Sequence, residues 1–350
     1  MRTGFRSVLL VAVAASACAI AAGGAAAQPQ GTVVYDDFGS GSYTLADYAA
    51  KWSNIYGPLD AAAGATLSFA DGSFALDDVP FRSGADFSVF DHLKYIAISN
   101  QAFDVPQLGS LQFDSDIKAD TPGAADGRVV HGTYIQSGAP YTAATMQGQQ
   151  AGAVMNMISF QTGQLFDWFI AGNTAFDLVE RLPSAVTGST SPDYVGPSLM
   201  YTQIVSEFQI ASGVYHHVGI RYTRNLTGDN VKFYLDGKLV DTVSNVGIPL
   251  DRRGSGQHWS GTYPSLGPGE PLRPYLNSFQ FGHGAFSLID AFPFQWGWTP
   301  DVDGSLPCLT SYATYRAACD AGVSMPLAER LFGQGVDANF DNFTATTKGG

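Results

Sequence analysis

The sequence is poor in basic residues, glutamate and cysteine, and each shortage limits the partners or structures that the protein can have. Only 18 lysines and arginines stand against 31 acidic residues, which gives a net charge of -13. This balance argues against nucleic acid or an anionic membrane as a partner, because both require basic patches. The acidic residues are mostly aspartate, which suits turns and loops more than helices. The glutamates are Glu180, Glu207, Glu270 and Glu329.

The N-terminus has the composition of a secretory signal peptide. Two arginines precede an uncharged run that ends in three alanines at Ala27, the small-residue pattern of a cleavage site. A membrane anchor or, through Cys18, a lipoprotein are the alternatives, but no charged stop-transfer sequence follows. No later segment is long and apolar enough to span a bilayer. We therefore expect a signal peptide at 1–27 and a secreted or periplasmic mature protein without membrane insertion.

Cysteine usage agrees with export. Removal of the signal leaves Cys308 and Cys319 with ten residues between them, which favours one disulfide that closes a local loop in an oxidising compartment. Two lone cysteines make an unlikely metal site. No His-x-His or His-x3-His spacing involves His92, His258 or His283, so we predict no transition metal.

From Gly31 onward the pattern predicts β structure throughout. Alternating runs are separated by turns rich in glycine, proline, aspartate and serine, which indicates an all-β, two-sheet antiparallel sandwich. No internal repeat or Pro/Ser-rich linker divides the chain, so we expect one domain over 28–350. The expected strands are 32–38, 67–76, 93–99, 110–119, 129–136, 154–161, 165–171, 201–210, 215–222, 231–235, 238–243, 277–283 and 339–346. Short helices are expected at 44–51, 311–319 and 326–332, and a long loop at 248–274.

Residues 212–243 carry the pattern of a complete β-hairpin. His216 alternates with valine and isoleucine, so it should face the core and be satisfied by a backbone partner. His217 should lie on the opposite face. The residues at 227–230 supply turn chemistry. Asp236-Gly237 is a common short reversal that can adopt positive φ.

This hairpin resembles those of concanavalin A-like sandwiches of the laminin G type. The matching runs are Tyr215-His216-His217-Val218, Phe233-Tyr234-Leu235-Asp236-Gly237-Lys238-Leu239 and Phe279-Gln280-Phe281-Gly282. In addition, 35–38 and 340–343 resemble the first and last strands, which such sandwiches place side by side. The resemblance implies two antiparallel sheets of concanavalin A-like or jelly-roll type whose concave face or loops often bind glycans. It also implies that a structural calcium ion could bind where Asp37 and Asp341 approach each other.

The sequence departs from the enzymes of that architecture. It lacks the Glu-x-Asp-x-Glu run of laminarinase-like glycosidases and the Arg-Thr-Glu and Gln-Ile-His strands of jelly-roll alginate lyases. The nearest analogue is one strand face that carries Asp114, Asp116 and Lys118, with side chains two residues apart at roughly 6–7 Å. Paired carboxylates at that range can share acid and base roles in glycoside cleavage. The alternative is a solvated outer face.

Histidines are the other candidates for chemistry. His131, with Tyr134 on the same predicted strand, could remove a proton α to a carboxylate and protonate the leaving oxygen, as a lyase requires. His217 and Arg221 could hold a carboxylate-bearing sugar such as a uronic acid. An ordinary structural or exposed position is the alternative for each of them.

Tryptophans supply the most useful binding signal. Trp296 and Trp298 lie two residues apart in a segment bounded by proline and glycine, so both can face the same way. Displayed tryptophans stack on sugar rings or on other flat apolar ligands. A buried loop anchor is the alternative. His258 and Trp259 in the long loop could form the opposite wall of a cleft.

Three functions stay open at this point. The first is an exported glycan-directed protein, either a polysaccharide hydrolase or lyase or a polysaccharide binder. The second is an exported acid–base enzyme, such as a lyase, isomerase or cyclase, acting on a non-carbohydrate small molecule in a pocket lined by His131, Tyr134 and Trp168. The third is a non-catalytic envelope or adhesion protein. Long ordered loops cost conformational entropy that a plain scaffold does not need, which favours an enzyme. Apart from the calcium ion, we expect no cofactor.

Overall fold

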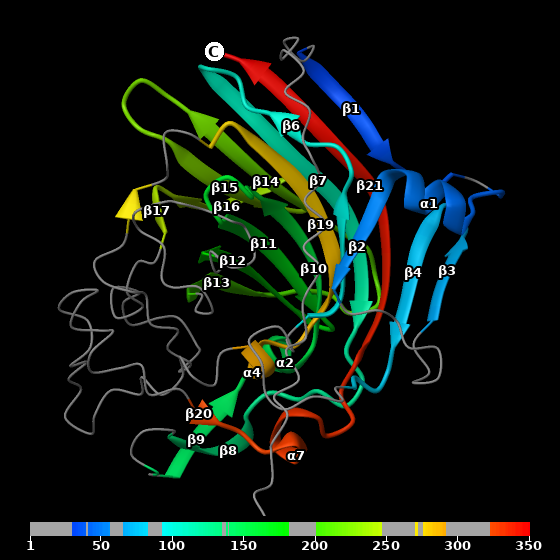
Figure 1. Ribbon diagram of the computed structural model, residues 1–350, viewed down its shortest axis with the longest axis vertical. Helices are drawn as coiled ribbons and strands as arrows, with labels where there is room; N and C mark the ends of the chain where they lie inside the picture. The colour runs from blue at the N-terminus through cyan, green and yellow to red at the C-terminus, as the bar shows by residue number, and fades with distance from the viewer. Residues whose placement is uncertain are drawn as a thin grey trace, which may run out of the picture.

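Two curved antiparallel sheets, called sheet A and sheet B below, form the body of the protein (Figure 1). They face each other across a shared hydrophobic core. The expected all-β, two-sheet antiparallel sandwich with a few short helices is therefore confirmed. The computed structural model describes residues 30–39, 41–56, 66–82, 93–134, 138, 140–181, 201–246, 270–271, 276–291 and 323–350.

Sheet A carries the predicted hairpin. Its strand order is β16-β15-β14-β7-β21-β4-β3, and β1 pairs with β21 beside this path. The first and last described strands thus lie side by side, as expected, with Asp36 opposite Phe343 (Figure 1). The strands are β1 (Gly31–Asp36), β3 (Thr66–Ala70), β4 (Ser73–Asp78), β7 (Gly109–Asp120), β14 (His216–Arg224), β15 (Asn230–Leu235), β16 (Lys238–Val243) and β21 (Val336–Gly349).

Sheet B faces sheet A with the order β13-β12-β11-β10-β19-β5-β2, and β6 pairs with β19. Its strands are β2 (Trp52–Tyr56), β5 (Leu93–Ser99), β6 (Phe103–Asp104), β10 (Gly152–Ile158), β11 (Gln164–Ala171), β12 (Thr174–Arg181), β13 (Tyr201–Gln209) and β19 (Ser278–Phe286). Two small sheets contain β8 (Arg128–Tyr134), β9 (Pro140–Thr145) and β20 (Val323–Ser324), and β17 (Asn245–Val246) with β18 (Glu270–Pro271). The described helices are α1 (Leu45–Lys51), α2 (Gln147–Gln150), α4 (Leu288–Ala291) and α7 (Leu327–Arg330).

Side-chain alternation builds the core between the sheets. In β7, Phe113 and Ile117 are completely buried, and Phe113 stacks on Phe281 of β19 with ring centroids 3.7 Å apart. A second hydrophobic cluster, which includes Phe169 and Leu178, lies on the other face of sheet B. Strands β10 and β11 of sheet B are therefore buried on both faces, whereas β14 and β15 of sheet A alternate between buried and more exposed residues.

Several predicted elements differ from the observed ones. The pattern predicts a single strand over 67–76, but the chain reverses at Asp71 and Gly72, whose φ values are 52° and 73°, so β3 and β4 form instead. Strands β2, β9 and β12 lie where the sequence pattern predicts none. The predicted helices 44–51 and 326–332 correspond to α1 and α7.

Other expectations fall on residues that the structure does not describe. These are the signal peptide at 1–27, the helix at 311–319 and most of the loop at 248–274. In the described part of the chain, no helix has both the length and the hydropathy needed to cross a membrane.

The stacked pair across the core predicts a large effect of one substitution. Phe281→Ala removes a buried ring and leaves a cavity against Phe113, so the free energy of unfolding should fall by about 3–5 kcal/mol. Leu226→Ala is the control, because Leu226 is 89% exposed, and it should change stability by less than about 0.5 kcal/mol. Urea denaturation measures both. A loss below about 1 kcal/mol in Phe281→Ala would contradict this packing.

Candidate functional site

The pairing of β7 with β14 places polar side chains on the outer face of sheet A. Phe113 and Ile220 belong to the core, so strand alternation directs the residues between such positions outward. The register sets three pairs side by side: Asp116 with His217, Asp114 with Gly219, and Gln112 with Arg221. The term polar row is used below for Gln112, Asp114, Asp116, His217, Arg221 and Asn342.

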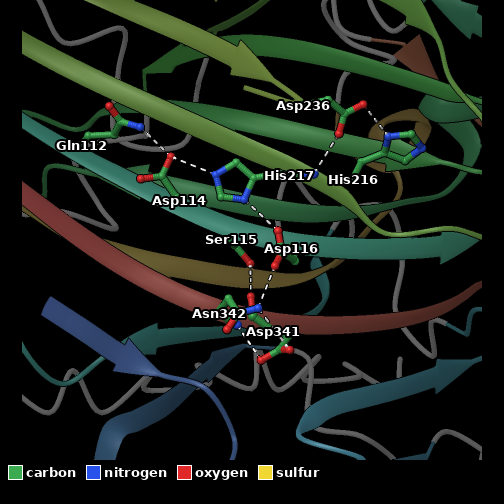
Figure 2. Close-up of polar contacts among 9 residues, drawn as sticks. All are labelled: Gln112, Asp114, Ser115, Asp116, His216, His217, Asp236, Asp341 and Asn342. Atoms are coloured by element: carbon green, nitrogen blue, oxygen red, sulfur yellow. Dashed lines mark hydrogen bonds and ion pairs between the residues drawn. The ribbon is translucent and has the colours of Figure 1, made fainter. Parts of the chain in front are cut away.

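His217 is held between two carboxylates. Its Nδ1 donates to Asp116 Oδ1 at 2.7 Å, and its Nε2 lies 3.6 Å from Asp114 Oδ1 (Figure 2). These contacts with Asp114 and Asp116 raise the pKa of His217 to about 10, although partial burial acts in the opposite direction. Burial also raises the pKa of Asp116, but hydrogen bonds from His217 and Asn342 outweigh it and lower that pKa. At neutral pH the row therefore holds an imidazolium against an ionised Asp116.

Asp114 continues the row toward Arg221. Asp114 is buried and accepts a hydrogen bond from Gln112 Nε2 at 2.6 Å. Gln112 Oε1 in turn accepts from Arg221 Nε at 2.6 Å, and the guanidinium lies 4.7 Å from the centroid of the Tyr234 ring. Gly219 leaves the space for this carboxylate, because a Cβ there would lie 2.5 Å from Asp114 Oδ1. The row is thus connected from Arg221 to His217.

Asn342 holds the other end of the row through an irregularity in β21. The register of β21 against β7 shifts between Asp341 and Thr344, and Asn342 has a φ of 54°. Its Nδ2 donates to Asp116 Oδ2 at 2.7 Å (Figure 2). Ser115 Oγ donates to the Asp341 carbonyl at 3.0 Å and ties β7 to β21 below the row. The Asp116 carboxylate is therefore fixed from both neighbouring strands.

The reversal at Asp236-Gly237 fixes the two histidines of the hairpin. The φ values of 49° and 75° confirm the positive φ expected there. Asp236 Oδ2 accepts from His216 Nδ1 at 2.9 Å, and Oδ1 accepts from the backbone N–H of His217 at 3.0 Å. His216 is buried, and its Nε2 lies 2.8 Å from the Ala211 carbonyl oxygen. The expectation that His216 faces the core with a backbone partner is confirmed.

His131 belongs to a different part of the fold. It lies on β8 of the small sheet β20-β8-β9, and its Nδ1 is 3.3 Å from Glu329 Oε2 with the imidazole 60% exposed. Tyr134 is also on β8, but its side chain is outside the described residues. Trp168 is completely buried and donates from Nε1 to the Gly219 carbonyl at 3.1 Å. The expected pocket lined by His131 and Trp168 is therefore wrong, because Trp168 belongs to the core between the sheets.

The remaining expected site residues lie outside the described part of the chain: His258, Trp259, Trp296, Trp298, Cys308 and Cys319. Within the described part, no group of three or more His, Cys, Asp or Glu side chains is arranged to hold a metal ion. Besides burial, the charges of Asp116 and Asp37 raise the pKa of Asp341, so Asp37 and Asp341 are electrostatic neighbours. Calcium binding there stays a prediction.

Sequence reasoning did not identify Gln112, Gly219 or Asn342. Gln112 has the same strand parity as Asp114, and Gly219 has that of His217, so alternation alone could have added both residues to the row. Asn342 offered no comparable signal, because its side chain reaches Asp116 through a register shift that alternation does not predict.

Comparison with protein-family models places the chain in a family. The chain belongs to a family of unknown function, DUF6081, whose profile matches residues 36–349. A search of curated proteins finds no significant match.

Several solved structures are similar to this chain. An endo-1,3-beta-glucanase from Streptomyces sioyaensis has 10% identity and a TM-score of 0.40 over 93% of this chain and 100% of that chain. The carbohydrate binding module CBM66 from Bacillus subtilis has 14% identity and a TM-score of 0.27 over 67% of this chain and 91% of that chain. A sialidase has 12% identity and a TM-score of 0.39 over 91% of this chain, which spans only 18% of the sialidase. Similarity this low transfers no activity.

The contacts of Asp114 and Asp116 with the His217 ring, called the clamp below, predict a pH-dependent contribution to the stability of the protein. Its pKa is about 10 in the folded protein against an ordinary 6.5, so the folded state binds the proton more tightly than the unfolded state does. The contribution is complete below pH 6.5 and is lost as the pH rises toward 10. The difference in Tm between the wild type and His217→Gln should therefore shrink over this range.

The matched control is the same substitution made in an Asp114→Asn/Asp116→Asn background. The difference in Tm between the Asp114→Asn/Asp116→Asn protein and its His217→Gln variant should then be independent of pH. The reason is that the carboxylates that raise the pKa of His217 are gone. Differential scanning calorimetry measures all four proteins. A wild-type minus His217→Gln difference that stays constant from pH 6 to 10 would show that the clamp is absent.

Proposed function

We propose that this protein is an exported glycan-binding protein and that the polar row on sheet A holds a neutral saccharide. The observation that carries the proposal is the fixed network around His217, in which carboxylate, amide, imidazolium and guanidinium groups are held by one another on an outward-facing sheet surface. The signal-like N-terminus supports export.

Pre-organisation favours binding over an incidental surface cluster. Sugar hydroxyls both donate and accept hydrogen bonds, so they require donors and acceptors at fixed positions. Asp116 accepts from two sides, and the imidazole of His217 is 46% exposed beside it. Side chains that already occupy their bound positions lose little conformational entropy when a ligand binds. The row therefore offers a saccharide a surface that is ordered before binding.

The pKa values favour binding over proton transfer at this row. A general base or acid works best when its pKa lies near the operating pH. The pKa of His217 is about 10, and that of Asp116 is lowered, so neither group changes protonation near neutral pH. We therefore assign Asp116 to ligand binding instead of the acid or base role that the strand pattern first favoured.

The charge balance favours a neutral ligand over a uronic acid. The cationic groups His217 and Arg221 are engaged with Asp116 and Gln112, and Asp341 adds a further carboxyl group beside Asp116. The chain as a whole carries a net charge of -13. A carboxylate-bearing sugar would meet like charges at close range, which costs free energy.

A glycan-binding panel with point variants tests the proposal. The wild type should bind at least one neutral polysaccharide, and Asp116→Asn should weaken that binding about 10-fold or more, because a charged hydrogen-bond acceptor is lost. Gly219→Ala should act in the same direction, since a Cβ displaces Asp114. Isothermal titration calorimetry measures the Kd values.

Asp77→Asn is the matched control, because Asp77 is an exposed carboxylate on β4 of the same sheet, outside the row. It should leave the Kd unchanged. Binding that survives both Asp116→Asn and Gly219→Ala would contradict the proposed site, and no binding across a broad neutral panel would contradict the function itself.

A further inference from the structure

Two tyrosines lie beside the polar row on sheet A, one toward each end of it. Lys118 follows Asp116 by two residues on β7 and therefore shares its outer face. The Nζ of Lys118 lies 5.5 Å from the ring centroid of Tyr215, which directly precedes β14 and is 45% exposed. Tyr234 of β15 pairs with Gly219 of β14 and is partly exposed. Both rings therefore border the row.

A cation holds each of these rings in place. Lys118 lies over Tyr215, and the guanidinium of Arg221 lies 4.7 Å from the centroid of the Tyr234 ring. A cation over an aromatic ring is attracted by the negative charge of the ring face. Arg221 is itself fixed, because its Nε donates to Gln112 Oε1 at 2.6 Å. The orientation of each ring is thus set before a ligand binds, which lowers the entropy cost of binding.

The two tyrosines are too far apart for one sugar unit to touch both. Tyr215 and Gly219, the cross-strand neighbour of Tyr234, are four residues apart, and a strand rises about 3.3 Å per residue. The tyrosines are therefore separated by roughly 13 Å along the strand direction. The charged centre of the row, Asp116 with His217, lies between them. A ligand that reaches both rings must be an extended chain that passes over this centre.

We propose that the polar row binds an internal run of a linear neutral glycan, about three or more sugar units long, with Tyr215 and Tyr234 as stacking platforms for the outer units. The middle unit lies over Asp116 and His217 and exchanges hydrogen bonds with them. This inference rests on the proposed function and narrows it, because it selects a chain over a single sugar or a chain end.

The chemistry of this face matches such a chain. A sugar ring has apolar C–H faces that stack on aromatic rings, and hydroxyl groups at its edge that pair with donors and acceptors. The side chains along the row follow the same order, with an aromatic ring, the charged centre and a second aromatic ring. Leu239, which is 51% exposed and paired with Tyr234, extends the apolar surface at that end. A wholly apolar ligand would desolvate the charged centre without replacing its hydrogen bonds, which costs free energy.

The dependence of binding on chain length tests the inference. The probes are cello-, laminari-, xylo- and manno-oligosaccharides, each as the disaccharide and the hexasaccharide. Isothermal titration calorimetry on the full mature chain measures the Kd values. The wild type should bind at least one hexasaccharide about 10-fold or more tightly than its disaccharide, because only the longer chain reaches both rings.

Removal of the two rings should remove that preference. Tyr215→Ala and Tyr234→Ala should each weaken hexasaccharide binding about 3–10-fold, because an aromatic contact is lost. The double variant should keep only the few-fold difference that comes from the larger number of binding positions on a longer chain. Tyr215→Phe should keep the wild-type preference, because it keeps the ring. Val214→Ala is the matched control, since Val214 is adjacent and 47% exposed, and it should leave both Kd values unchanged.

Saturation-transfer NMR gives a second readout. Saturation of the aromatic protons should reach the C–H protons on one face of sugar units in the bound hexasaccharide. Tyr215→Phe should keep this transfer, and the Tyr215→Ala/Tyr234→Ala variant should lose it. Tm values of all variants, measured in parallel, show that the fold is intact.

The outcomes separate this inference from the proposed function. If Asp116→Asn weakens hexasaccharide binding but the tyrosine variants bind as tightly as the wild type, the inference is overturned and the proposed function stands. Equal wild-type affinity for the disaccharide and the hexasaccharide also overturns the inference, because the row would then recognise a single unit or a chain end. Absence of binding to every probe overturns both.

Discussion

The register between β7 and β14 is the constraint on which the polar row depends. Because side chains alternate along a strand, a slip by one residue would turn Asp114 and Asp116 into the core and Phe113 outward. The core opposes such a slip, since Phe113 stacks on Phe281 of the facing sheet. The indole N–H of Trp168 adds a bond from sheet B to the β14 backbone at Gly219. Packing between the sheets thus positions polar groups on the surface.

Aspartates on the two sheets have pKa values that are shifted in opposite directions. Asp116 lies beside a cationic imidazole and an amide donor, and its pKa is lowered despite partial burial. Asp167 is completely buried near a second carboxyl group, and its pKa is raised. The same residue type is therefore ionised on sheet A and favours its protonated form on sheet B.

The hairpin was predictable because its signals are local. Alternation separates His216 from His217, and Asp236-Gly237 supplies the residues that adopt positive φ. The contact from Asn342 to Asp116 depends on an irregular register in a strand 226 positions away in sequence, which no local pattern encodes. The sequence pattern did not single out Asp167, for a different reason. Its strand is apolar on both faces, so alternation does not distinguish the two faces of the strand. Strand β12, which carries Glu180, was not predicted.

His217 is a cation fixed between two carboxylates, and the polar row is arranged around it. The most direct test is an NMR pH titration of the His217 ring resonances, assigned with the His217→Gln variant. The ring should keep its protonated chemical shifts through pH 8 and titrate with a pKa of about 10. Titration near the ordinary value of 6.5 would contradict the clamp and the binding site that is built on it.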